Sequence, residues 1–463
     1  MDITDTICAP ATAPGGALCI IRVAGPSAIT LTDRIFKPRK GKPLGERKGY
    51  TLIFGDIERA DGSLIDEVVV SLYRAPHSYT GENAVDISCH GSPYITHEIL
   101  SRLVDEGCRP ARPGEFTERA FLNGKMDLSQ AEAVADVIAS TSRAAHQVAL
   151  SQMRGGFSRE LDALRNRLLH FASLMELELD FSDHEDIEFA DRSELLALSD
   201  EIDSVITRLI HSYRAGNAIK HGIPVTIVGE TNAGKSTLLN ALLGEERAIV
   251  SDVHGTTRDI IEDTLTIDGV MFRFIDTAGL RQTADVVENM GIDRTYTKLK
   301  QAAIVIWMID STDITTAEHL RTDLLTRVGK RPLIVLFNKC DELTEANQNA
   351  ITTHFNGVGT HQLFISARNG LHLDELRHLL SHVAALPDLS KNDIIVTNAR
   401  HYEALLRAHD AIRRAHNGLT QGLSGDFVSQ DIRECIHHLS DIAGDVTSDS
   451  ILKNIFSHFC IGK

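Results

Sequence analysis

The segment "IPVTIVGETNAGKSTLLNAL" (223–242) constrains the fold of this chain most strongly. A strand-like apolar run leads into Gly229, and four residues separate it from Gly234-Lys235-Ser236. Glycines at these positions let backbone N–H groups wrap phosphates at the N-terminus of a helix. Lys235 adds a positive charge at the β- and γ-phosphates, and the Ser236 hydroxyl is a ligand for Mg²⁺. The segment therefore predicts a strand, a phosphate-binding loop and a helix within an α/β domain.

Three further motifs follow in chain order, each at the end of a strand-like run. In "FRFIDTAGL", Asp276 can hold Mg²⁺ through water and the Gly279 N–H can sense the γ-phosphate. In the preceding "SDVHGTTRD", Thr257 can complete the metal shell. In "PLIVLFNKCD", the Asp341 carboxylate accepts the N–H donors of guanine N1 and N2, a pair that adenine lacks. In "LFISAR", the Ser366-Ala367 backbone meets guanine O6. Together the four motifs predict a domain that binds GTP and hydrolyses it to GDP and phosphate.

This block resembles the Ras-like translation-factor GTPases, which implies a Ras-like P-loop G domain. The predicted GTP-binding residues are Asn232, Ala233, Gly234, Lys235, Ser236, Thr237, Ser251, Asp252, Val253, His254, Gly255, Thr256, Thr257, Asp276, Thr277, Ala278, Gly279, Asn338, Lys339, Asp341, Ser366, Ala367 and Arg368. Among them, Ser236 and Thr257 are the predicted Mg²⁺ ligands.

Two positions depart from Ras-type chemistry. Leu280 follows "DTAG" where Ras carries the glutamine that orients water, so another group must do so here. Asn232 lies inside the phosphate loop, where GTPases that use K⁺ in place of an arginine finger carry an asparagine. The predicted K⁺ ligands are the Asn232 amide, the Ser251 and Val253 carbonyls and the Thr256 hydroxyl. The alternative is that Asn232 only caps the loop.

The pattern of apolar and turn residues changes three times along the chain and divides it into four regions. Residues 1–123 alternate strand-like runs with turn residues and predict an α+β domain, whereas 124–217 show helical spacing of apolar residues. The strand–helix alternation occupies 218–385, and helical spacing returns over 386–463. The economical architecture is a multidomain α/β + α protein, in which the G domain is inserted into a helical bundle domain.

Composition limits the partners and the compartment. The net charge of −17 gives no general attraction to nucleic acid, so a local patch or a basic second subunit would have to hold it. Seven scattered cysteines without a CxxC pair, and a start that lacks a signal-peptide run, predict a reducing cytoplasm. No apolar run is long enough to span a bilayer. The acidic run "ELELDFSDHEDIEF" is read as a solvated face, with a metal site as the alternative.

The combination of "NAGKS", "GTTRD", "DTAGLR" and a terminal "FCIGK" is similar to the MnmE (TrmE) family of tRNA modification GTPases. The N-terminal "SYTGENAVDISCHG" and "RPGEFTERAFLNGKMDLSQAEAVADVI" carry the same resemblance over the rest of the chain. It implies a K⁺-activated GTPase that adds an aminomethyl-type group at carbon 5 of the wobble uridine of tRNA. A tetrahydrofolate derivative (5-formyl or methylene) supplies the one-carbon unit in the N-terminal domain, which also mediates homodimerisation. An MnmG-type protein carries the FAD, and a heterotetramer is implied.

The resemblance also implies site residues. The folate contacts of the family carry over to Arg22, Glu82, Lys125 and the terminal Lys463. A glutamate after "DTAG" orients the attacking water in this family, and Glu288 matches it. In the tail, which is expected to fold back onto the folate pocket, Cys460 is either a nucleophile at uridine carbon 6 or a small packed residue.

Two other classes compete with this reading. The first is a ribosome-assembly GTPase of the Era and EngA type, in which a KH-like domain follows the G domain. Here the region is helical, and the GxxG at 422–425 is followed by Asp426 rather than by basic residues. The second is a dynamin-type membrane-remodelling GTPase, which no basic amphipathic segment supports.

Overall fold

The computed structural model of the whole chain describes residues 4–13, 15–180, 192–230, 232–244, 263–275, 299, 301–384, 394–444, 449–457, 459 and 461–462. The chain forms two compact units. Unit 1 comprises Met1–Ile138, Leu150–Ile206 and Ala404–Lys463, and unit 2 comprises Ala139–Ala149 and Thr207–Glu403.

Unit 1 contains a seven-stranded sheet in the order β3-β4-β5-β6-β2-β1-β7. Neighbouring strands are antiparallel except β1 and β7, which pair in parallel. The strands are β1 (Ile7–Pro10), β2 (Leu18–Ala24), β3 (Phe36–Pro38), β4 (Thr51–Glu58), β5 (Leu64–Tyr73), β6 (Ala84–His90) and β7 (Arg109–Pro110).

Side-chain alternation gives this sheet one buried face. Along β5, Val68, Val70 and Leu72 are at most 1 % exposed, whereas the intervening Val69 is 38 % exposed. Helices α1 (Ala28–Ile35) and α2 (Pro93–Asp105) add apolar residues to the same core. The opposite face of β4 and β5 therefore remains open.

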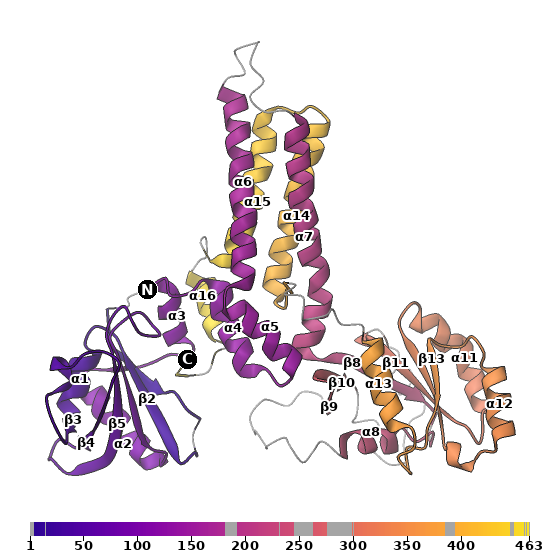
Figure 1. Cartoon of the computed structure of the whole chain (residues 1–463), viewed down its shortest axis with the longest axis horizontal. Coiled ribbons are helices and arrows are strands. Elements are labelled where there is room, and N and C mark those ends of the chain that lie inside the picture. Colours follow the sequence, from indigo (N-terminus) through magenta and orange to yellow (C-terminus); the bar gives the residue numbers. More distant parts are fainter. Residues whose placement is uncertain are drawn as a thin grey trace. The chain divides into compact units, whose positions relative to one another are not determined.

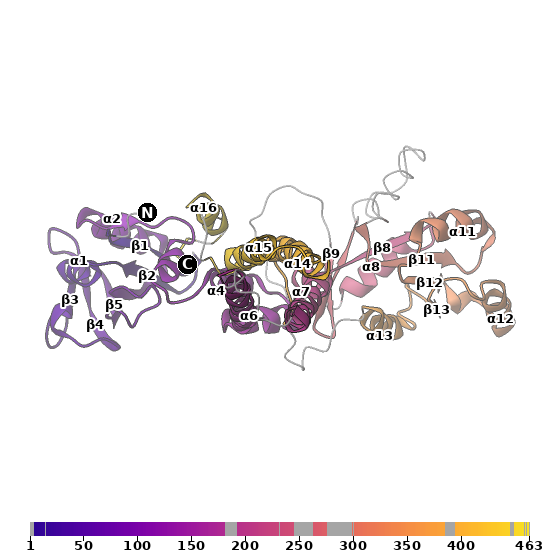
Figure 2. The ribbon, with the colours of Figure 1, turned by 90° about the horizontal axis from the view of Figure 1, so that it is seen from above.

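The other described helices that lie wholly or partly in unit 1 include the long helices of a bundle. They are α3 (Glu115–Leu122), α4 (Leu128–Ala139), α5 (Arg143–Met153), α6 (Gly156–Asp180), α7 (Arg192–His221), α14 (Ala399–Thr420), α15 (Gly425–Ala443) and α16 (Asp449–Ser457). Helices α6 and α15 lie side by side (Figures 1 and 2). The apolar residues that predict the inner face of α6 are all at most 3 % exposed: Leu161, Leu164, Leu168, Phe171 and Met175. The predicted bundle core is therefore confirmed.

Unit 2 is built on a six-stranded sheet in the order β13-β12-β11-β8-β10-β9, in which only β9 and β10 pair antiparallel. The strands are β8 (Ile223–Gly229), β9 (Asp263–Ile267), β10 (Val270–Phe274), β11 (Ile304–Asp310), β12 (Leu333–Asn338) and β13 (His361–Phe364). In the described part of unit 2, the helices that follow strands of this sheet are α8 (Lys235–Gly244), α11 (Thr315–Val328), α12 (Glu345–His354) and α13 (Leu373–Val383).

The side chains of strand β11 are buried on both faces of this sheet. Ile304, Ile306 and Met308 join a core with residues of α8 and α13, whereas Val305 and Trp307 join a second core with residues of α11 and α12. A central parallel strand buried on both faces reads as a continuous apolar run, as "AIVIWMI" does. The predicted buried strand is confirmed, and its carboxyl end lies at the edge where ligands bind in open α/β sheets.

None of the helices in the described ranges is long and apolar enough to cross a membrane. Six cysteines lie in those ranges, and all of them are buried free thiols.

Candidate functional site

The phosphate-binding loop joins β8 to α8 in unit 2. Gly229 (φ +151°), Asn232 (φ +70°) and Gly234 (φ +98°) all have positive φ, which makes the loop turn tightly before the helix begins at Lys235. The Lys235 ammonium donates to the Gly229 carbonyl at 2.8 Å and to the Glu230 carbonyl at 2.5 Å. Burial lowers the pKa of Lys235. The ammonium thus lies within the loop, where a phosphate would give it a stronger partner than a carbonyl.

Asn338, at the end of β12, connects the phosphate-binding loop to the segment after β13. Its side-chain amide donates to the Ala233 carbonyl at 2.8 Å, and its side-chain carbonyl accepts the Ala367 N–H at 3.0 Å. A Cβ on Gly234 would lie 2.3 Å from the Asn338 amide nitrogen, so only glycine fits there. Asn338 is 4 % exposed. One buried amide therefore joins three loops that are far apart in the sequence.

The predicted base-reading residues follow the same strand. Asp341 is exposed, and one of its carboxylate oxygens accepts a hydrogen bond of 2.9 Å from the Asn369 amide. Lys339 has a φ of +64° and forms an ion pair with Asp310 at the end of β11. The Ala367 N–H is already engaged by Asn338, so a guanine O6 at this position would share that donor. The structure therefore brings Asp341 and the 366–367 backbone to one end of the sheet, beside the phosphate loop.

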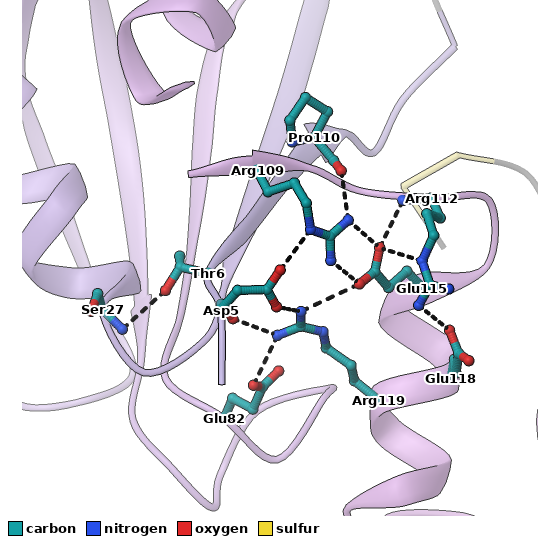
Figure 3. A network of polar contacts seen from close by, with 10 residues as sticks. All are labelled: Asp5, Thr6, Ser27, Glu82, Arg109, Pro110, Arg112, Glu115, Glu118 and Arg119. Atoms are coloured by element: carbon teal, nitrogen blue, oxygen red, sulfur yellow. Dashed lines mark hydrogen bonds and ion pairs between the residues drawn. The ribbon is translucent and has the colours of Figure 1, made fainter. Parts of the chain in front are cut away.

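Unit 1 contains a dense set of charged side chains that we call the Arg119 cluster (Figure 3). Its members are Asp5, Glu82, Arg109, Arg112, Glu115, Glu118 and Arg119. Arg119 is 1 % exposed and Glu115 is 2 % exposed. Such burial is rare for charged residues unless they are paired.

Glu115 anchors one side of the Arg119 cluster. Arg109 donates to both of its oxygens, and the Arg112 backbone N–H donates to Oε2 at 2.8 Å. Burial alone would raise the pKa of Glu115, but the hydrogen bonds from Arg109 and Arg112 outweigh burial and lower it to about 2. The carboxylate is thus held ionised inside the fold.

Replacing Glu115 with glutamine is expected to lower the free energy of unfolding by about 3 kcal/mol at pH 7. The folded pKa lies below the unfolded value, so this stabilisation is present above the unfolded pKa. It is lost as the pH falls from about 4.5 to about 2. Urea unfolding at pH 7 and at pH 3 would measure the difference, with exposed Glu46→Gln as the control. A Glu115→Gln deficit that is no smaller at pH 3 would contradict the assignment.

Three of the four predicted folate contacts lie around the segment 76–83. The Arg22 guanidinium binds Asp86 through two hydrogen bonds of 2.9 and 3.1 Å and lies 5.6 Å from the centre of the Tyr79 ring. Lys125 donates to the Pro76 carbonyl at 3.1 Å. Glu82 belongs to the segment itself, and burial raises its pKa. The structure thus brings these three together from β2, from the 76–83 segment and from the turn after α3.

The C-terminal tail returns to the same sheet. Gly462 is buried, and a Cβ there would lie 2.1 Å from the Pro10 carbonyl oxygen at the end of β1. Pro10 pairs with Ile21 in the register that pairs Ala9 with Arg22. Upstream, the rings of Phe456 and Phe459 have centroids 5.3 Å apart. The tail therefore ends next to the strand position of Arg22.

Several predicted residues lie outside the described residues, so their roles stay predictions. They are Glu288, Cys460, Lys463, Ser251, Asp252, Val253, His254, Gly255, Thr256, Thr257, Asp276, Thr277, Ala278 and Gly279. Most of the acidic run "ELELDFSDHEDIEF" also lies outside them. Within the described ranges, no group of three or more His, Cys, Asp or Glu side chains is placed to hold a metal ion.

Of the Arg119 cluster, the sequence predicted only Glu82, as a folate contact. The stretch "RPGEFTER" contains four charged residues in eight, which favours an exposed surface. One signal was present, because Glu115 and Arg119 are four residues apart and so share a helix face. That spacing alone does not show that the face is buried.

A mainly parallel sheet, with a tight glycine-containing loop between β8 and α8 and with Asn338 and Asp341 after β12, is the arrangement of the P-loop GTPase class. The family model described as "MnmE helical domain" matches residues 128–460, and the one described as "GTP-binding protein TrmE N-terminus" matches residues 6–125. The chain therefore belongs to the MnmE family of tRNA modification GTPases. The predicted family and fold class are confirmed.

Two relatives agree with this assignment. A tRNA modification GTPase MnmE of Bacteroides fragilis is 61 % identical, and one of Bacteroides thetaiotaomicron is 60 % identical; each match covers 99 % of both chains. Among solved structures, the G domain of the FeoB iron transporter of T. maritima is 26 % identical over 35 % of this chain and 98 % of that chain, with a TM-score of 0.26.

Proposed function

We propose that this protein is a K⁺-activated, Mg²⁺-dependent GTPase of the cytoplasm that acts in tRNA modification. With an FAD-dependent partner of the MnmG type, it adds an aminomethyl-type group at carbon 5 of the wobble uridine, using a one-carbon unit from tetrahydrofolate. The observation that carries the proposal is full-length membership of the MnmE family together with the braced phosphate loop. The GTP site would take the phosphates on Lys235 and the guanine on Asp341.

The folate part of the proposal is supported by the gathering of Arg22, Glu82 and Lys125 around the segment 76–83. Two cations and a carboxylate suit a ligand that has both N–H donors and a negatively charged tail. The fourth predicted contact, Lys463, directly follows Gly462, which is buried against Pro10. When bound, the folate supplies the one-carbon unit, and these side chains would hold and orient it.

Substitution of Gly462 by alanine is expected to weaken 5-formyltetrahydrofolate binding roughly tenfold, the scale of one lost charge-assisted hydrogen bond. The added Cβ cannot coexist with the Pro10 carbonyl 2.1 Å away, so the tail would lose its place. Calorimetry would measure the affinity, and Ile461→Ala is the matched control because Ile461 is 57 % exposed. GTP hydrolysis should stay unchanged in both variants. Native folate affinity in Gly462→Ala would refute the role of the tail.

A homodimer is supported by the open face of β4 and β5. Leu52 is 74 % exposed, Phe54 is 49 % exposed, and Phe54 pairs with Val69 across the two strands. Neighbouring apolar side chains on one sheet face are typical of a surface that another chain covers. We assign this face to a second copy of the chain.

The tRNA substrate needs a positive surface on an acidic chain. The segment between β3 and β4 contains five basic residues within ten positions: Arg39, Lys40, Lys42, Arg47 and Lys48. Four of them are exposed and Arg47 is half-buried, while Arg39 pairs with Asp56 and Glu67 and Lys42 pairs with Glu46. Cations at this density support contact with phosphates.

The competing ribosome-assembly function has no comparable support, because the secondary structure described after the sheet of unit 2 is helical and consists of α13, α14, α15 and α16. The experiment that separates the two functions is purification of the chain from cells. Folate that co-purifies would support the proposal, whereas ribosomes without folate would favour the alternative.

A further inference from the structure

The guanidinium of Arg119 is buried on α3 and makes four contacts (Figure 3). One terminal nitrogen donates to the Asp5 carbonyl at 2.8 Å and to Glu82 Oε1 at 3.1 Å. The other terminal nitrogen contacts the Asp5 carboxylate and donates to Glu115 Oε1 at 3.3 Å. Arg119 thus ties the N-terminal segment and the 76–83 segment to α3.

The carboxylates of the Arg119 cluster differ in how many cations they contact. Glu115 has Arg109, Arg112 and Arg119 as partners, and Glu118 has Arg112. For Glu82, Arg119 is the one cation in ion-pair contact among the described residues. Among the described residues, Arg119 is thus the cation that orients the Glu82 carboxylate and favours its ionised form, and the Thr80 side chain adds a smaller contribution.

The two oxygens of Glu82 differ. Oε1 accepts from Arg119, whereas Oε2 is buried and has no hydrogen-bond partner in the part of the chain that the structure describes. A buried carboxylate oxygen without a partner is unfavourable, so a ligand that donates an N–H there recovers a lost interaction. The backbone around Glu82 is fixed as well, since its N–H donates to the Thr80 hydroxyl and its carbonyl accepts from Ser78.

We propose that Arg119 is the positioning residue of the folate site: it holds Oε1 of Glu82 and thereby presents Oε2 as a bare acceptor to the N–H edge of the ligand. This inference rests on the proposed folate function and adds to it a residue that does not itself touch the ligand. The acceptor suits a ring with adjacent N–H donors, such as a 2-amino-4-oxopyrimidine edge.

Arg119 also governs the protonation of Glu82. Burial raises the pKa of Glu82, Arg119 counteracts this, and the Asp5 carboxylate raises it further. Other titratable groups at the 76–83 segment are His77 and Tyr79 of the segment itself, Lys125, whose ammonium is bound to Pro76, and the Arg22–Asp86 pair. Loss of Arg119 should therefore push the Glu82 pKa upward, and the ionised acceptor would form only at higher pH.

The test compares Arg119→Gln and Arg119→Lys with Arg112→Gln, which alters the same cluster without touching Glu82. Calorimetry from pH 4.5 to pH 9 would measure the affinity for 5-formyltetrahydrofolate, and thermal unfolding would establish that each variant is folded. We expect Arg119→Gln to bind at least tenfold more weakly at pH 7, with the acidic limb of binding displaced to higher pH. Arg119→Lys should recover part of the affinity and part of the native pH profile. Arg112→Gln should keep the native pH profile.

A native pH profile in Arg119→Gln, or an equal displacement in Arg112→Gln, would overturn the proposal. If Arg119→Gln does not fold, Arg119→Lys decides, because native affinity in that variant contradicts a role that needs the guanidinium geometry. A wild-type chain that binds no folate would refute the folate function itself. The Glu82 pKa, followed by ¹³C NMR of labelled glutamate in Arg119→Lys, would then still show whether Arg119 controls this carboxylate.

Discussion

Replacing Asn338 with alanine is expected to weaken GTP binding roughly a thousandfold. The change leaves the Ala233 carbonyl and the Ala367 N–H buried without the partner that now joins them. Each unsatisfied buried group costs about 1–3 kcal/mol, and about 4 kcal/mol corresponds to a factor of roughly a thousand. The loss falls on nucleotide affinity because these two groups fix the phosphate loop and the guanine-binding segment.

Fluorescence titration with a labelled GTP analogue would measure this effect. Asn349→Ala is the matched control, since Asn349 is an exposed asparagine on α12 in the same unit. Circular dichroism should show that both variants keep their helices. GTP affinity in Asn338→Ala within about threefold of the wild type would contradict the bracing role, because threefold is about 0.7 kcal/mol, less than one unsatisfied buried group costs.

Glu288→Ala is expected to retain GTP binding and to lose hydrolysis by roughly two orders of magnitude, the scale of a positioned acid–base group. Leu280 stands where Ras has its glutamine, so the attacking water needs another acceptor. Glu288, twelve residues after Asp276, is the residue that the family resemblance assigns to this task. Single-turnover phosphate release would give the rate, and Asn289→Ala, which changes the next residue in the chain, is the control that should keep it.

The cation half of this mechanism has its own test. K⁺ held by Asn232 would stabilise negative charge that develops on the leaving oxygens. Hydrolysis should rise in KCl over NaCl at matched ionic strength, and Asn232→Ala should abolish that response while Glu345→Ala, on the exposed surface of α12, should keep it. Equal rates in the two salts would remove K⁺ from the mechanism. If Glu288→Ala still hydrolyses GTP, Arg281 or Asp285 becomes the candidate for the residue that orients the attacking water.

The nucleotide site could be predicted from the sequence because its parts are local. Phosphate wrapping needs glycines within one loop, and base reading needs a carboxylate at one strand end, so both leave short motifs. The role of Asn338 could be predicted only in part. Its partner Ala233 lies 105 residues away, and no local pattern shows that the side chain braces the loop.

The helical part of the fold was predictable for a similar reason. Leu161, Leu164 and Leu168 repeat at helical spacing, and that spacing fixes which face of α6 is buried. Strand β11 was recognisable because burial on both faces removes polar residues from a run.

The Arg119 cluster could not be predicted, because mutual pairing overrides the usual exposure of charged residues. Asp5, Glu82 and Arg119 come from three separate segments, and only the folded sheet brings them together. The return of the tail to the sheet of unit 1 was expected from the family resemblance, but its contact was not, since Gly462 and Pro10 are far apart in the sequence.

The measurement that tests the proposed function most directly is the nucleoside composition of tRNA after reaction. The chain would be incubated with an MnmG-type FAD protein, unmodified tRNA, methylenetetrahydrofolate, a nitrogen donor and GTP, in KCl or in NaCl. The tRNA would then be digested, and its nucleosides would be identified by mass spectrometry. We expect a uridine with an aminomethyl-type addition in KCl with GTP, and little of it in NaCl or without GTP. Unmodified uridine in the complete KCl reaction, or equal product without GTP, would contradict the account.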